Sequence, residues 1–134
     1  MRHTLLLVLS LAAAPAAAQD ALDFTGLWRA NPTAQCVYTG GDGSALKIED
    51  NTLFGVENRC VMTNPVNVTD MQAQLYNMDC TGEGDRFEGR AMFMRASDGG
   101  MYLIWDGIAF KYESCAEDAA VGTVITSDQI GITE

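Results

Sequence analysis

Four cysteines and a near absence of histidine constrain this chain more than any other feature of its sequence. The cysteines are 24, 20 and 35 positions apart, at Cys36, Cys60, Cys80 and Cys115. No pair has the close spacing of a zinc knuckle or of a redox Cys-x-x-Cys site. The one histidine, His3, lies close to the N-terminus. His3 is lost if residues 1–18 are removed as a secretory leader, so the mature chain offers no imidazole for serine-type or cysteine-type catalysis. The even number of widely spaced cysteines favours two structural disulfides.

Residues 1–18 have the features of a secretory signal peptide. Arg2 gives a positive start, residues 5–14 form a short apolar run, and residues 16–18 are three alanines. This pattern predicts cleavage before Gln19 and export to the periplasm or the medium. The apolar run is too short to cross a bilayer, which needs about 20 residues. No cysteine follows the leader directly, so we expect no membrane anchor.

The pairing of the cysteines is a separate question, because four cysteines allow three connectivities. We expect Cys60–Cys80 to join neighbouring strands, and Cys36–Cys115 to tie the start of the domain to its end. Closing a loop of the second size stabilises a protein by about 3–5 kcal/mol in the chain-entropy model.

The mature chain reads as short strands divided by turn residues, and no segment shows a sustained helical period. The expected strands are residues 24–29, 36–38, 45–49, 52–57, 59–63, 71–80, 86–96, 101–106 and 108–115. This regular spacing is typical of a sandwich or barrel. We predict an all-β domain over residues 19–115, a small antiparallel meander closing into a barrel, since closure removes exposed edges. Residues 116–134 form an acidic tail that either adds one strand or is loosely held.

The charge of the mature chain is strongly negative. Without Arg2, seven basic residues stand against eighteen acidic ones, a net charge of −11. Such a surface repels nucleic acid and anionic membranes, so neither is an expected partner. It attracts cationic proteins, or it only keeps a monomeric exported protein soluble.

Two groups of side chains raise the question of metal binding. Met92 and Met94 share one face of an expected strand, and thioethers suit Cu(I), but methionine more often fills irregular apolar space. A set of carboxylates surrounds one turn, namely Asp79, Glu83, Asp85 and Glu88. Their spacing does not match the twelve-residue calcium loop, and an exposed, hydrated turn explains them. We therefore predict no metal site and no cofactor.

Two resemblances concern the barrel as a whole. Gly26-x-Trp28 on the first strand is similar to the opening of lipocalin-like barrels and of some periplasmic protease inhibitors. Apart from this resemblance, we expect Trp28 simply to plug one end of the barrel. A wider framework resembles small exported four-cysteine proteobacterial proteins of unknown function, and it implies a fold and a compartment but no activity. It consists of Trp28, Cys36, Glu57-x-x-Cys60, Cys80 with Gly82-Glu83-Gly84, and Tyr112-x-x-Cys115.

A third resemblance concerns one turn. Ser97-Asp98-Gly99-Gly100-Met101-Tyr102 resembles the Ser-Gly-x-x-Tyr loop of the C-type lysozyme inhibitors, which are small periplasmic β-barrels, although an extra residue intervenes here. In that family the loop enters the active-site cleft of lysozyme. The resemblance implies a binding site formed by the residues of this turn, with one further acid nearby, namely Ser97, Asp98, Gly99, Gly100, Tyr102 and Asp106. An ordinary hairpin turn has the same composition.

These observations favour a non-catalytic periplasmic binding protein over an enzyme. Acidic residues are plentiful, but no pair stands out as the two carboxylates of a glycoside hydrolase. Inhibition of a cationic hydrolase such as lysozyme is the leading hypothesis. A periplasmic carrier of a metal or small ligand is the first alternative, and a structural component of the cell envelope is the second. An internal cavity in the barrel would favour the carrier.

Overall fold

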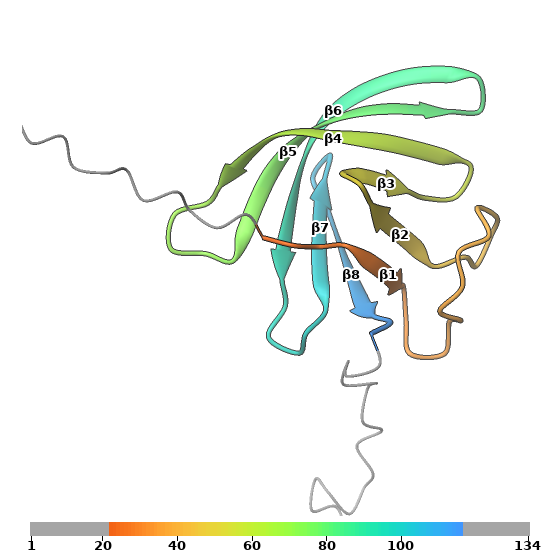
Figure 1. Cartoon of the computed structure of the whole chain (residues 1–134), viewed down its shortest axis with the longest axis horizontal. Helices are drawn as coiled ribbons and strands as arrows, with labels where there is room; N and C mark the ends of the chain where they lie inside the picture. The colour runs from red at the N-terminus through yellow and green to blue at the C-terminus, as the bar shows by residue number, and fades with distance from the viewer. Residues whose placement is uncertain (1–21, 117–134) are drawn as a thin grey trace, which may run out of the picture.

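The computed structural model describes residues 22–116, which form a closed antiparallel barrel of eight strands in sequence order (Figure 1). The strands are β1 (Gly26–Arg29), β2 (Leu46–Glu49), β3 (Thr52–Phe54), β4 (Asn58–Asn67), β5 (Ala73–Gly82), β6 (Asp85–Arg95), β7 (Met101–Trp105) and β8 (Ile108–Ser114). Each strand pairs with the next, and β8 returns to β1 where Trp28 lies opposite Ser114. The predicted all-β meander and its closure are confirmed.

Two regions of the sequence predictions lie outside these residues. They are the signal peptide expected at residues 1–18 and, apart from Ala116, the tail expected at residues 116–134. Within the described part of the chain, no helix is long and apolar enough to span a membrane.

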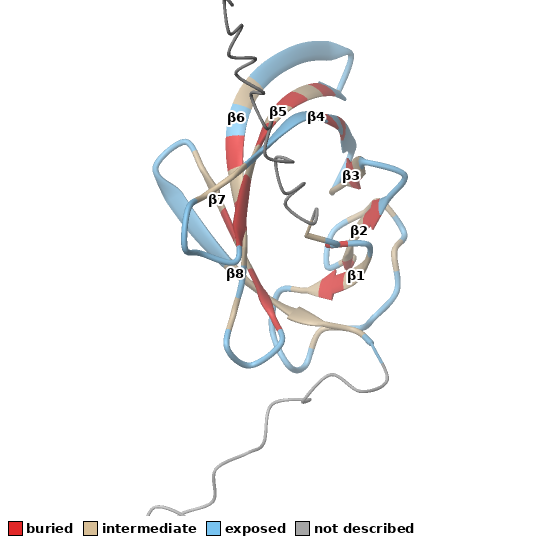
Figure 2. Ribbon diagram, turned by 60° about the vertical axis from the view of Figure 1, so that its left-hand side comes forward, coloured by how far each residue is buried: buried red, intermediate tan, exposed pale blue. Residues whose placement is uncertain are grey.

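The barrel interior is filled by alternate side chains, as the period of two along a strand requires. On β6, Ala91 and Phe93 are buried, whereas Met92 and Met94 face outward and are half-buried. The buried stretches of neighbouring strands line the inside of the barrel (Figure 2). The core consists of Phe24, Trp28, Ile48, Leu53, Cys60, Met62, Tyr76, Met78, Cys80, Ala91, Phe93, Met101 and Leu103.

The two ends of the barrel differ. At one end the residues before β1 pack on the core, and we call this the closed end; its connections are residues 50–51, 68–72 and 96–100. Trp28 is only 4% exposed there, and its Nε1 donates to the Phe24 carbonyl oxygen at 2.9 Å. The ring of Phe24 lies 5.7 Å from that of Phe93. The other end, called the open end, carries the connections 30–45, 55–57, 83–84 and 106–107.

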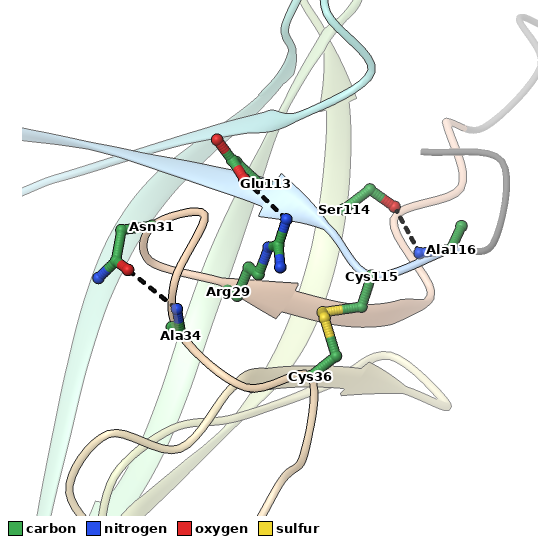
Figure 3. The surroundings of a disulfide bond; sticks show 8 residues. All are labelled: Arg29, Asn31, Ala34, Cys36, Glu113, Ser114, Cys115 and Ala116. Carbon is green, nitrogen blue, oxygen red and sulfur yellow. Dashed lines mark hydrogen bonds and ion pairs between the residues drawn. A yellow bond between two sulfur atoms is a disulfide. The ribbon is translucent and has the colours of Figure 1, made fainter. Parts of the chain in front are cut away.

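Both predicted disulfides are confirmed. Cys60 and Cys80 lie directly opposite each other on β4 and β5. Cys36 and Cys115 are 79 positions apart, and their bond ties the β1–β2 connection to the end of β8 (Figure 3). The second disulfide thus fastens a long connection beside the seam at which the barrel closes.

The strand predicted at residues 36–38 is wrong. Cys36 is held by its disulfide to the end of β8, and Val37 is exposed. Val37 makes one backbone hydrogen bond to the start of the next segment, from Ala45 N to the Val37 carbonyl oxygen at 2.9 Å. Tyr38 instead packs edge-on against Phe54, with ring centroids 5.9 Å apart. A run of only three residues does not establish a strand when no neighbouring strand is free to pair with it.

Two strand ends also differ from prediction. The break expected at Asn64-Pro65 is a β-bulge within β4, whose register shifts between Thr63 and Val66 and whose Asn64 has a φ of 50°. Proline has no N–H to donate, and bulges are a usual place for it within a sheet. Strand β3 ends three residues earlier than predicted, because the chain already turns at Glu57, which has a φ of 55°.

Candidate functional site

The open end of the barrel contains a cavity of about 410 Å³. Its lining comes from the β1–β2 and β3–β4 connections and from β2, β3, β4, β7 and β8. The lining residues are Ala30, Asn31, Ala34, Gly43, Ser44, Ala45, Leu46, Leu53, Gly55, Val56, Asn58, Leu103, Trp105 and Tyr112. None of them is an acidic or basic residue, although the chain as a whole is strongly acidic.

The strands contribute the apolar part of this cavity. Leu53 and Leu103 are buried in the barrel core, and Leu46 packs partly buried against it. Trp105 and Tyr112 are half-buried on β7 and β8 and add two aromatic rings. Apolar walls with a few polar groups are typical of sites for small ligands.

The β1–β2 connection supplies the remaining wall and is fixed by its own hydrogen bonds. The Asn31 side-chain oxygen accepts from the amides of Thr33 and Ala34, at 3.1 and 2.9 Å. Ser44 Oγ accepts from the Thr39 amide at 2.8 Å. Together with the Cys36–Cys115 bond, these contacts hold the connection in place beside the cavity. Figure 3 shows the disulfide and the hydrogen bond between Asn31 and Ala34.

Two residues that line the cavity carry a hydrogen-bond donor with no partner within residues 22–116. The donors are the Tyr112 hydroxyl and the Trp105 indole N–H. Burial raises the pKa of the Tyr112 hydroxyl, which is a donor at neutral pH as in any tyrosine. The Trp105 ring lies against Gly89, where an added Cβ would come within 2.6 Å of the indole nitrogen. Both donors are therefore left without an acceptor among the described residues.

A patch of exposed apolar side chains lies beside the cavity at the same end of the barrel. Phe87, Ile108 and Phe110 are 42%, 56% and 41% exposed, and with Trp105 they line a shallow hollow of about 280 Å³. The Phe87 and Trp105 ring centroids are 6.4 Å apart. Trp105 thus belongs to both the cavity and the patch. Exposed apolar patches mark binding surfaces more often than isolated exposed residues do.

The turn singled out by sequence lies at the opposite, closed end. Its backbone is an ordinary hairpin turn, in which Ala96 N donates to the Gly100 carbonyl oxygen at 2.9 Å. Asp98 Oδ2 lies 2.7 Å from Lys111 Nζ, which in turn lies 5.8 Å from the Tyr102 ring centroid. The hydrogen bonds from Lys111 and from the Gly100 amide lower the pKa of Asp98. The charge of Asp98 is therefore already compensated within the chain.

The structure brings together only part of the set that sequence proposed. Residues 97–100 and Tyr102 are neighbours, but Asp106 follows the far end of β7 and lies at the open end. Gly100 is buried, and an added Cβ there would approach the Tyr112 carbonyl oxygen to 2.5 Å. A glycine at this position is thus explained by backbone packing alone.

The side chains that the sequence suggested as metal ligands are spread over the barrel or are already paired within the protein. Asp79 forms an ion pair with Arg86 at 3.1 Å. No group of three or more histidine, cysteine or acidic side chains could hold a metal ion within the described residues. Met92 lies between Leu75 and Ile104 on the outer face of the barrel. Packing against these apolar neighbours explains a methionine at this position.

A larger hollow of about 530 Å³ lies along β4, β5 and β6. Its polar groups are largely paired within the protein: Asn77 Oδ1 accepts from Arg90 Nη1 at 2.6 Å, and Asp79 is paired with Arg86. We give more weight to the smaller cavity, which combines apolar walls with unpartnered donors.

Sequence reasoning missed most of this cavity. Trp105 lies on an expected strand, residues 101–106, but nothing in the sequence groups it with Ala34, Leu46 or Leu53. Comparisons of the chain with protein-family models, with curated proteins and with solved structures gave no match.

Proposed function

We propose that this chain is a non-catalytic exported protein that binds a small, largely apolar molecule in the open end of its barrel. The observation that carries the proposal is the cavity of about 410 Å³, which lies within the usual size range of small-ligand sites. Its aromatic and aliphatic walls would bury the apolar part of the ligand. The Tyr112 hydroxyl and the Trp105 indole N–H would bind an acceptor group.

The construction of the barrel supports this role. Cys60–Cys80 joins two adjacent strands, and Cys36–Cys115 fixes the connection that forms part of the cavity wall. A site that is already formed loses less conformational freedom on binding. Two disulfides also fit an oxidising compartment outside the cytoplasm. With the signal-peptide features of residues 1–18, they support a periplasmic or secreted location.

A cavity-filling variant tests the proposal. Ala34→Phe places a large ring among the lining residues, so we expect it to weaken the binding of 1-octanol, a neutral apolar probe, at least ten-fold in calorimetric titration. Gln35→Phe is the matched control: it adds the same ring on the same connection, but Gln35 is exposed and does not line the cavity. No octanol binding by the unmodified protein, or equal losses in both variants, would contradict the proposal.

Binding of a cationic protein is a second candidate, and the surface charge favours it. The mature net charge of −11 would speed association with a basic partner such as a C-type lysozyme. Lysozyme inhibition at low and moderate salt, with Tyr102→Ala and Asp98→Ala beside the unmodified protein, tests this candidate. Inhibition that is unaffected by Tyr102→Ala would place the contact away from the 97–102 turn, and no inhibition at micromolar protein would end the case for lysozyme.

A further inference from the structure

We infer that the ligand of the open end is a cation: an apolar molecule carrying an amine or quaternary ammonium group that stays near the mouth of the cavity. This inference rests on the proposed function and names the chemical class of its ligand. It follows from how charge is distributed between the cavity and its surroundings.

Every connection at the open end carries at least one carboxylate. Asp42 lies on the β1–β2 connection, Glu57 on the β3–β4 connection, Glu83 on the β5–β6 connection and Asp106 on the β7–β8 connection. Within the described residues, none of these four side chains forms an ion pair. They therefore contribute uncompensated negative charge around the mouth.

The nearby basic side chains are mostly neutralised. Lys47 on β2 pairs with Glu49 at 3.0 Å, and Arg86 on β6 pairs with Asp79. Arg29, at the end of β1, lies 3.2 Å from Glu113 across the barrel seam and is largely buried (Figure 3). Arg59, near the start of β4, is the one base of this end that forms no ion pair within residues 22–116. The net potential at the mouth is consequently negative.

The aromatic rings at this end suit a cation as well. Trp105, Phe87 and Phe110 lie together at the mouth, and the face of an aromatic ring attracts a cation within about 6 Å of its centre. The same barrel shows this arrangement elsewhere: Lys47 Nζ lies 4.6 Å from the Phe54 ring centroid. An anionic head group would be repelled by the four carboxylates around the mouth, and the cavity lining has no basic side chain to form an ion pair with it.

Three probes with the same octyl chain separate the charge classes: octyltrimethylammonium, 1-octanol and octyl sulfate. We expect calorimetric titration of the mature chain at low salt to show the cation binding at least ten-fold more tightly than the anion. The preference should shrink as salt rises, because the reach of surface charge falls to about 3 Å at 1 M ionic strength.

Paired charge removals locate the source of the preference. Glu57→Gln with Asp106→Asn removes two charges at the open end, and Asp50→Asn with Asp70→Asn removes two at the closed end. The pairs are matched in backbone conformation, since all four residues have a positive φ, between 47° and 59°. We expect only the open-end pair to reduce the preference for the cation, by about three-fold or more, with octanol binding unchanged in both.

The octanol result keeps this inference distinct from the proposed function. If octanol binds in the cavity and the cation has no advantage over the anion, the charge inference is wrong and the proposed function stands. An equal loss of preference in both double variants would also overturn the inference, because the effect would then belong to the overall charge. If no octyl probe binds, both are wrong.

Discussion

At the scale of single residues, the closed end contains a buried group of hydrogen-bonded polar side chains that the sequence pattern did not indicate. Gln74 is 2% exposed and is the one buried polar or charged residue within the described part of the chain. Its Nε2 donates to Asn67 Oδ1 at 2.5 Å, and its Oε1 accepts from the Tyr76 hydroxyl at 2.6 Å. Burial, and then the nearby charge of Asp23, raise the pKa of Tyr76. Buried polar groups are costly unless they are paired in this way.

Tyr76→Phe should therefore destabilise the protein by about 1–3 kcal/mol, because the Gln74 oxygen loses its donor in a place that water does not reach. Chemical denaturation of the mature protein under non-reducing conditions measures this change. Tyr102→Phe is the control, since Tyr102 is half-buried on the outer face and its hydroxyl has no hydrogen-bond partner within residues 22–116, so its cost should stay within about 0.5 kcal/mol. Equal costs for the two variants would contradict the assigned role of the Gln74–Tyr76 pair.

At the scale of elements, the sequence predicts well where alternation is long and the turn residues are distinctive. The turn at Asp50-Asn51 is an example, with φ values of 47° and 54° at its two residues. Strands β5 and β6 were also predicted to within two residues at each end, because ten or more residues of each follow one pattern. The β1–β2 connection was misjudged, because its conformation depends on a disulfide and on side-chain hydrogen bonds rather than on periodicity.

That connection gives a prediction at the same scale. Replacing Cys36 and Cys115 together by serine should lower the free energy of unfolding by about 2–5 kcal/mol and should weaken octanol binding, because the wall containing Ala34 is released. Cys60→Ser with Cys80→Ser should also destabilise the fold, yet it should preserve octanol affinity in the fraction that remains folded, because that bond lies between adjacent strands. Thermal unfolding with calorimetric titration below the unfolding transition tests both statements. Unchanged octanol affinity in the Cys36/Cys115 variant would show that the connection needs no disulfide to form the wall.

At the scale of the whole molecule, the barrel is asymmetric, and the asymmetry explains why the site was only partly foreseen. Trp28 and Phe24 fill the closed end, as expected from the sequence for Trp28. The 97–102 turn lies at this end, whereas Asp106 lies at the other, because β7 carries the chain along the barrel between them. A cavity built from seven separate elements leaves no local pattern in the sequence. The closure of the barrel could be predicted, but the space left inside its open end depends on packing.

The measurement that tests the central claim most directly is a two-dimensional ¹H–¹⁵N NMR titration of the mature protein with 1-octanol. If the open end is the binding site, the largest shifts should occur at the Trp105 indole N–H and at the backbone amides of Leu46, Leu53 and Leu103, while the amides of residues 97–100 stay unchanged. Shifts concentrated in residues 97–102, or along β4 and β5 around Val61 and Asn77, would contradict the account by placing the binding site elsewhere on the barrel, and so would a spectrum that octanol leaves unchanged.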